Sequence, residues 1–142
     1  MKCTVSEKTV PEKTTPEKTA SYIDSDQYAK RLGIELLEST ADSARCKLVV
    51  NETHVNGVGS VHGAVIFALA DITFAAACNH VNAAIGMQAD IRFLNRPSGT
   101  ELYADASVIS ASNKIAHYQV EVTDGEGKKI AQFTGTAYKL NK

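Results

Sequence analysis

The pattern of apolar and polar residues predicts a series of strands in the second half of the chain. Residues 115–123 alternate between apolar and polar side chains, which is the period of a strand with one buried face. Residues 86–94, 101–111 and 129–140 read as further strands, and short turns of Pro, Ser, Asn, Asp and Gly separate them. Four consecutive strands joined by short turns predict an antiparallel meander.

The first half of the chain predicts one long helix preceded by shorter elements. Residues 25–32 form a short helix that Gly33 ends, and residues 34–37 and 44–50 form two strands. Residues 63–79 form the long helix, because apolar side chains recur there at spacings of three and four. Its predicted buried face carries Ile66, Leu69, Ala70, Thr73, Phe74 and Ala77. We therefore expect an α+β fold, in which an antiparallel sheet packs against one central helix.

Residues 1–22 differ in composition from the rest of the chain. The tetrapeptide SEKT at residues 6–9 recurs as PEKT at 11–14 and 16–19. These residues contain too few apolar side chains to offset the entropy cost of ordering the chain, so we expect a flexible Thr/Lys/Glu/Pro tail. The folded domain is expected over residues 23–142.

Composition and charge exclude several classes of protein. The 142 residues carry a net charge of -1, so no basic field favours nucleic acid. The longest apolar run is too short to span a membrane. The three cysteines lack C-x-x-C spacing and the four histidines lack the spacing of metal ligands, which predicts a reducing compartment and no metal. With no apolar leader segment at the N-terminus, we expect a cytoplasmic protein without a membrane partner.

Asp71 is the one charged residue within the predicted long helix, and it lies off the predicted buried face. It is about eight residues into the helix, whereas a capping or dipole role requires the first turn. The residues around it are mostly small and apolar, which predicts a partly buried carboxylate. Such a group suits a general base or a nucleophile at neutral pH.

Three further candidates precede Asp71. Gly63 follows His62 where the loop of residues 51–61 becomes the helix, and the backbone N–H groups at a helix start suit a carbonyl oxygen or an oxyanion. A glycine at a helix entry is common, so the residue type alone does not distinguish a catalytic Gly63 from a structural one. Asn56 precedes Gly57 as in an ordinary turn; alternatively, its amide holds a water or a thioester near Asp71.

These residues resemble the motifs of the hot-dog-fold acyl-CoA thioesterases, in particular the phenylacetic acid degradation branch. The similarity lies in N-G-x-x-S-x-H-G at residues 56–63, L-A-D at 69–71, F-A-x-A-C-N at 74–79 and I-R-F-L-N-R-P at 91–97. It covers residues 27–140 approximately, which is everything except the tail. One difference is Ala64, which stands where the family usually has a second glycine and which adds a methyl group near the predicted acyl pocket.

The resemblance implies a fold, a reaction and a set of roles. The fold would be the hot-dog fold, in which the sheet wraps around the central helix and two chains pair into a homodimer or a homotetramer. Asp71 would be the base or nucleophile, and the Gly63 amide would polarise the thioester carbonyl. Asn56 and His62 would position the thioester or the water. No cofactor or metal would be needed, since coenzyme A is part of the substrate.

Spacing along the helix adds a constraint on the active site. Gly63 and Asp71 are separated by about 12 Å of helix rise, whereas both must lie within about 3 Å of one thioester group. We therefore expect an active site shared between two subunits. Arg92, Arg96 and Lys114 are candidates for contacts with the coenzyme A phosphates. Each of them is equally well interpreted as an ordinary surface cation.

The sequence thus predicts an acyl-CoA thioesterase acting on aryl- or medium-chain acyl groups. One alternative is an enoyl-CoA hydratase, but the order and setting of His62 and Asp71 do not suit that chemistry. The other is a non-catalytic acyl-CoA-binding module, which the presence of Asp71 disfavours.

Overall fold

The computed structural model describes residues 21–140. Most of the predicted tail therefore lies outside the described residues. Its last two residues belong to the folded part, because Ser21 caps the first helix and Tyr22 is the first residue of that helix. The change in composition predicted a domain that begins at residue 23, whereas the first helix begins at Tyr22.

The described residues form three α-helices and one six-stranded sheet. The elements follow one another as α1 (Tyr22–Ser25), α2 (Gln27–Leu32), β1 (Glu35–Ser39), β2 (Ser43–Val49), the 3-10 helix η1 (Glu52–His54), α3 (Gly63–Cys78), β3 (Ala84–Phe93), β4 (Glu101–Ala111), β5 (Ile115–Asp124) and β6 (Lys129–Lys139). The predicted strands and the long helix are confirmed, with ends that differ by a few residues.

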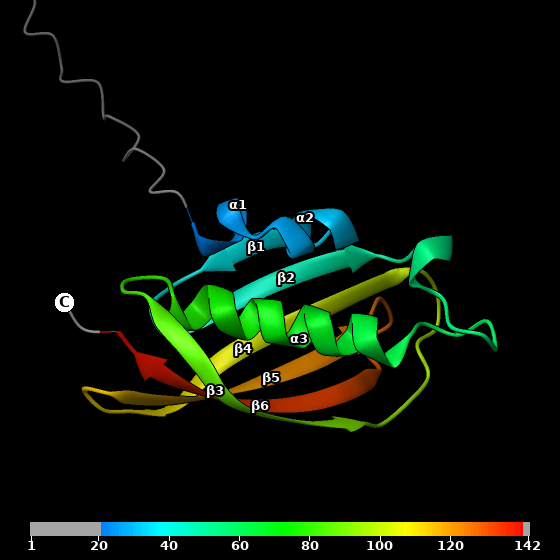
Figure 1. Ribbon diagram of the computed structural model, residues 1–142. Coiled ribbons are helices and arrows are strands. Elements are labelled where there is room, and N and C mark those ends of the chain that lie inside the picture. Colours follow the sequence, from blue (N-terminus) through cyan, green and yellow to red (C-terminus); the bar gives the residue numbers. More distant parts are fainter. Residues whose placement is uncertain (1–20, 141–142) are drawn as a thin grey trace, which may run out of the picture.

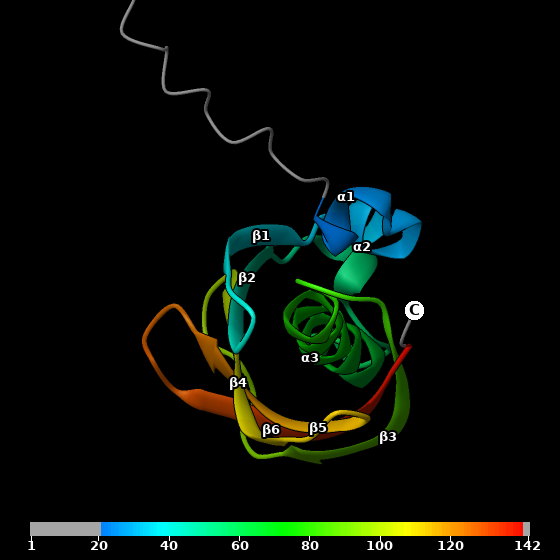
Figure 2. The same ribbon diagram turned by 90° about the vertical axis from the view of Figure 1, so that its left-hand side faces the viewer.

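The sheet wraps around α3 (Figures 1 and 2). Its strand order is β1-β2-β4-β5-β6-β3, and every neighbouring pair is antiparallel. The strand after α3 therefore returns to the far edge of the sheet and pairs with the last strand, so that β1 and β3 form the two edges. This arrangement confirms the predicted α+β class.

The predicted helix over residues 25–32 is instead two short helices. They are separated at Asp26, whose φ of -83° and ψ of 98° are extended. The Asp26 carboxylate accepts a hydrogen bond of 2.9 Å from the Ala29 N–H and so caps α2. Gly33 ends α2 in the left-handed conformation (φ 83°), as predicted from its lack of a side chain.

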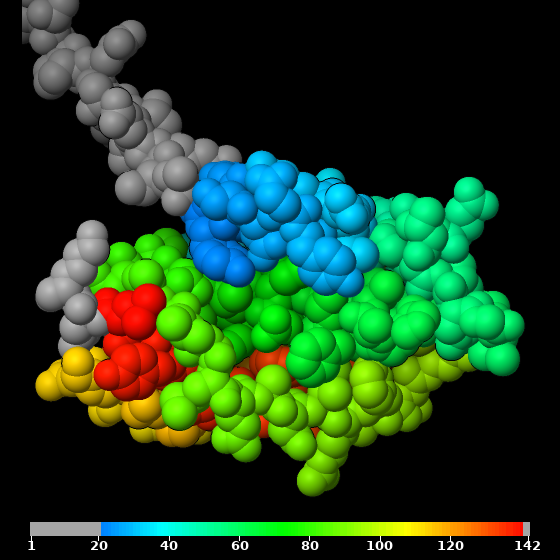
Figure 3. All heavy atoms as spheres, viewed as in Figure 1, coloured from blue at the N-terminus to red at the C-terminus, as the bar shows by residue number. Residues whose placement is uncertain are grey.

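The core lies between α3 and the inner face of the sheet. The six residues of the predicted apolar face of α3 are all buried, and so are several residues on its other sides. This extensive burial arises because the sheet surrounds part of the helix while α1 and α2 also contact it. One line along the helix stays at least partly exposed: Ala64, Phe67, Asp71, Ala75 and Cys78. In Figure 3, α3 shows as a green band between the blue N-terminal helices and the yellow-green edge strand β3.

The edge strand β3 exposes an unusual amount of apolar surface. Ile85, Met87 and Phe93 are each more than half exposed, at 55%, 60% and 55%. Within residues 21–140 no strand pairs with the outer edge of β3. An unpaired apolar edge of this length is open to pairing with another strand.

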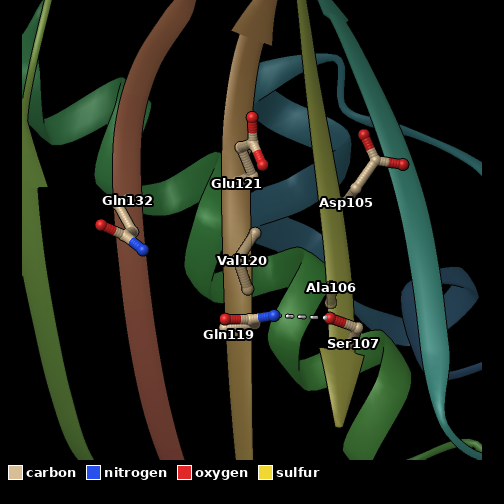
Figure 4. Close-up of a pocket in the computed structure, with 7 residues that line it drawn as sticks. All are labelled: Asp105, Ala106, Ser107, Gln119, Val120, Glu121 and Gln132. Atoms are coloured by element: carbon tan, nitrogen blue, oxygen red, sulfur yellow. Dashed lines mark hydrogen bonds between the residues drawn. The ribbon is translucent and has the colours of Figure 1, made fainter. Parts of the chain in front are cut away.

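The outer face of the sheet is polar and lies away from α3. A shallow depression of about 180 Å³ on this face is lined by Asp105, Ala106, Ser107, Gln119, Val120, Glu121 and Gln132 (Figure 4). Across it, the Gln119 side-chain amide donates a hydrogen bond of 3.4 Å to the Ser107 hydroxyl. Among the described helices none is long and apolar enough to cross a membrane.

Candidate active site

Asp71 lies in the middle of α3 and is partly buried, as its neighbours predicted. Burial raises the pKa of its carboxyl group, and the negative charge of Asp26 raises it further. A raised pKa makes the Asp71 carboxylate a stronger base than an ordinary surface carboxylate. These properties suit proton abstraction or nucleophilic attack.

Gly63 is the first residue of α3, and its N–H has no hydrogen-bond partner among residues 21–140. A free N–H at a helix start is a donor suited to a carbonyl oxygen. A Cβ at this position would meet the Phe93 ring at 3.5 Å, which is an ordinary contact. Packing within the chain therefore does not require a glycine here.

His62 is the N-cap of α3. Its Nδ1 atom accepts a hydrogen bond of 2.9 Å from the Ala64 N–H, while the ring as a whole is exposed. Because Nδ1 is an acceptor, the neutral ring carries its proton on Nε2, which is free to donate outward. The cap explains why the chain has a polar residue here, and it leaves one donor for a ligand.

Asn56 closes the loop before the helix. Its Oδ1 atom accepts hydrogen bonds of 3.0 Å from the N–H groups of Val58 and Ser60, as in the turn that the sequence offered as the simpler interpretation. The side-chain oxygen is therefore occupied by the turn. The side-chain NH₂ group has no partner among the described residues, so only this donor is free for a ligand.

A cavity of about 330 Å³ lies at the amino end of α3. Gly63, Phe93 and Arg96 are among the residues that line it. Arg96 is held there by a hydrogen bond of 3.5 Å from Nη2 to the Gly59 carbonyl. The fold thus brings Gly63 and Arg96 together, although 33 residues separate them in the sequence.

The other two predicted phosphate contacts lie elsewhere in the chain. Arg92 is exposed on β3, and Lys114 lies directly before β5 with its Nζ atom 6.0 Å from the centre of the Tyr138 ring. Tyr138 is opposite Ile115, whereas Ala131 is opposite Phe93, so Lys114 is roughly 23 Å along the sheet from the Arg96 end. Within one chain, Lys114 does not join the cavity at Gly63. Across the described residues, none of the three cations has a carboxylate partner within 4.0 Å.

Two polar residues near Asp71 were not among the sequence candidates. Tyr22 is the first residue of α1 and Asp26 lies between α1 and α2. The charge of Asp26 raises the pKa of Asp71, and the charge of Asp71 raises that of Tyr22 after burial and Asp26. No motif contains these residues, and their place beside α3 depends on how α1 and α2 pack against it. Cys78 is also near, but burial raises its pKa to about 11, so its thiol is not a nucleophile at neutral pH.

Comparison with known proteins identifies the family. Residues 58–131, a span that contains Gly63 and Asp71, match the thioesterase superfamily. The chain belongs to the thioesterase superfamily. It is 33% identical over 120 residues to the acyl-coenzyme A thioesterase PaaI of Escherichia coli, a match covering 82% of this chain and 85% of the relative. It is therefore a thioester hydrolase.

Solved structures place the chain in the phenylacetic acid degradation branch of this family. The E. coli PaaI protein from the phenylacetic acid degradation operon matches with a TM-score of 0.79 and 31% identity, over 83% of this chain and 87% of that one. A mutant of the phenylacetic acid degradation protein PaaI from Thermus thermophilus matches with a TM-score of 0.77 and 32% identity, over 81% and 100%. The expected hot-dog fold and thioesterase resemblance are both confirmed.

Proposed function

We propose that this thioesterase hydrolyses acyl-CoA thioesters with aryl or medium-chain acyl groups, releasing the free acid and coenzyme A. The observation that carries the proposal is the placement of two groups on α3. The helix begins with an unpaired N–H at Gly63, and its middle holds a partly buried carboxylate at Asp71. The E. coli relative named above is an acyl-coenzyme A thioesterase, which supports this substrate class.

In the proposed reaction, the Gly63 N–H donates to the thioester carbonyl oxygen. This bond strengthens as negative charge develops on that oxygen, so it stabilises the transition state more than the ground state. Asp71 then either removes a proton from an attacking water or attacks the carbonyl carbon itself, forming an anhydride that water hydrolyses. By either route the carbon–sulfur bond breaks, and the sulfur leaves as a thiol after taking up a proton.

We infer that each active site combines two subunits of a homodimer or homotetramer. Gly63 and Asp71 are too far apart on one helix to reach a single thioester group. The unpaired, apolar edge of β3 supports pairing with the β3 strand of a second chain, which would continue the sheet. Figure 3 shows α3 beside this edge strand. The partly exposed line of α3 that carries Asp71 would then face the partner.

Recognition of coenzyme A is assigned to exposed cations around the cavity. Arg96 borders the Gly63 cavity and has no acidic partner among residues 21–140, so its guanidinium is free to bind a phosphate. Arg92 is exposed on the same edge strand and remains a second candidate. Lys114 would contribute only if assembly brings it toward the cavity of another subunit.

The proposal is tested by measuring free thiol released from a panel of aryl- and medium-chain acyl-CoAs. The wild type is expected to release thiol, and Asp71→Asn is expected to lose about 10²- to 10⁴-fold in rate. Glu126→Gln, which removes an exposed carboxylate in the turn after β5, is the matched control and should retain wild-type activity. Full activity in a folded Asp71→Asn variant, or no release from any acyl-CoA by the wild type, would contradict the proposal.

A further inference from the structure

The N-terminal helices run along α3 in the opposite direction. Tyr22, at the start of α1, lines a cavity of about 270 Å³ with His80, which follows the carboxyl end of α3. At the other end of this segment, the Leu32 carbonyl accepts a hydrogen bond of 2.8 Å from His54 Nε2. The His54 carbonyl in turn accepts one of 2.8 Å from the N–H of His62, the N-cap of α3. The segment therefore extends along the length of α3, and hydrogen bonds attach its Leu32 end to the amino end of that helix.

Asp26 lies near the middle of this segment, and Asp71 lies near the middle of α3. Figure 1 shows α1 and α2 following one another along α3, and both helices contact it. The pKa shifts of Asp71 and Tyr22 agree with a position of Asp26 beside the middle of α3. The negative charge of Asp26 raises the pKa of Asp71, and burial together with both carboxylates raises the pKa of Tyr22 to about 12.

The Asp26 carboxylate is held in place by the backbone at the start of α2. Its Oδ1 atom accepts the hydrogen bond of 2.9 Å from the Ala29 N–H that caps α2. Tyr22 lies on the same segment, and burial, followed by the negative charge of Asp26, raises the pKa of its hydroxyl group to about 12. Tyr22 therefore keeps its proton at neutral pH and adds no charge beside Asp71.

Among the groups on the elements that pack against α3, Asp26 is the charged group that raises the pKa of Asp71, in addition to burial. Four groups on α3 or on the elements around it have pKa values raised chiefly by burial, and they stay neutral at neutral pH: Tyr22, Cys46, Cys78 and Tyr118. The carboxylates of Asp105 and Glu121 line the depression on the outer face of the sheet, away from α3. The ionisable side chains of α2 and β1 are exposed to solvent: Tyr28, Lys30, Arg31, Glu35 and Glu38.

We propose that Asp26 is a positioning residue of the active site, which makes Asp71 a stronger base or nucleophile by placing a fixed negative charge beside it. The inference rests on the proposed function, in which Asp71 carries out the reaction. A nearby negative charge destabilises the Asp71 anion, so this anion accepts a proton from water more readily or attacks a carbonyl carbon more readily. The N-terminal helices would thus tune the reaction without touching the substrate.

The test is the pH dependence of kcat/KM in the full-length protein with Asp26→Asn. Asparagine caps helices about as well as aspartate, so the variant should keep the fold and lose only the charge. Because the charge of Asp26 raises the pKa of Asp71, its removal lowers that pKa, and the acid limb of the profile should move to lower pH. Above the limb, kcat should fall several-fold because the base is weaker, with KM unchanged.

Asp24→Asn is the matched control. Asp24 lies two residues earlier and is exposed, and its carboxylate accepts a hydrogen bond of 3.0 Å from the Ser21 N–H at the start of α1. Its removal should leave the acid limb in place. An Asp26→Asn limb that coincides with the wild type, or an equal shift in Asp24→Asn, would overturn the proposal.

A second measurement separates this inference from the proposed function. The side-chain carboxyl ¹³C signal of Asp71 can be titrated by NMR without substrate, in the wild type and in Asp26→Asn. A lower midpoint in the variant supports the inference even if no acyl-CoA is hydrolysed, and an unchanged midpoint overturns it. Activity that survives Asp71→Asn would instead refute the proposed role of Asp71.

Discussion

Gly63 and Asp71 lie on the same helix, eight residues apart, with the free N–H at the helix start and the carboxylate in the helix middle. The rise of an α-helix places them about 12 Å apart along its axis. A thioester group spans far less than this, so the two residues of one chain would serve two different substrates. This spacing determines the first prediction.

Mixed dimers should recover activity that neither parent has. If Asp71→Asn chains are combined with Gly63→Pro chains, one of the two shared sites contains an intact Asp71 and an intact Gly63. Differently tagged chains, co-expressed and purified by both tags, should therefore show about half of the wild-type rate, since one of two sites is restored.

The control for this experiment is a chain that carries both substitutions, paired with a wild-type chain. In a shared-site dimer both sites are then damaged and activity should be lost. In a dimer with one complete site per chain the same pair would keep half of the activity, and that result would exclude the shared site.

Replacing Gly63 tests its N–H separately from its small size. Proline is tolerated at the first residue of a helix, and the ψ of 134° at His62 suits a following proline. Gly63→Pro should thus keep α3 but remove the donor, with an expected loss of about 10²- to 10³-fold in kcat. Gly63→Ala keeps the N–H and places a Cβ 3.5 Å from Phe93, an ordinary contact, so its loss should be smaller.

Steady-state kinetics and thermal melting of both variants check this prediction. Equal losses in Gly63→Pro and Gly63→Ala, with both proteins folded, would show that space rather than the N–H is what the reaction needs at this position.

Arg96 should matter for coenzyme A and not for the acyl group. A charge-assisted bond from Arg96 to a phosphate would raise KM about tenfold when lost, the equivalent of roughly 1.4 kcal/mol. Arg96→Ala should therefore weaken binding of acyl-CoA but not of the same acyl thioester of N-acetylcysteamine, which has no phosphate. Initial rates on the two substrates measure the difference.

Lys129→Ala is a suitable control for Arg96, because Lys129 is an exposed cation that pairs with Glu121 at 3.9 Å. It should leave both KM values unchanged. A similar rise of KM for both substrates in Arg96→Ala would mean that Arg96 supports the loop at Gly59 and does not bind phosphate.

The sequence predicted those features that depend on local pattern. The spacing of apolar residues was sufficient to predict the strands and α3. The small apolar residues around Asp71, which lies off the apolar face of that helix, indicated a partly buried carboxylate. The break at Asp26 was not predicted, because residues 25–32 are individually compatible with one continuous helix. The Asp26 cap of α2 is what divides this segment into two helices.

The relation of Asp26 and Tyr22 to Asp71 could not be predicted from the sequence. About 45 residues separate Asp26 from Asp71, and the charge effect of one on the other depends on how α1 and α2 dock onto α3. The position of β3 beside β6 is equally non-local, since it requires the chain to cross the sheet after α3. Periodicity carries no information on either point.

Asp124 should make the stability of the fold depend on pH. Its buried carboxylate accepts hydrogen bonds of 3.0 Å from the N–H groups of Ser98, Glu126 and Lys128, and so it ties the turn after β5 to the segment before β4. These bonds, first of all the one from Ser98, lower the pKa of the carboxyl below its ordinary value of 3.8. The anion is therefore the form that stabilises the folded state.

The sign of the effect follows from this lowered pKa. The stabilisation is fully present above about pH 3.8 and is lost as the pH falls through the lower pKa of the folded protein. Asp124→Asn should thus melt at a lower temperature than the wild type at pH 7, and the gap should narrow as both are titrated below pH 3.8. A gap of constant size down to acid pH would show that Asp124 contributes through packing alone, and a higher melting temperature for the variant at pH 7 would refute the stabilising role.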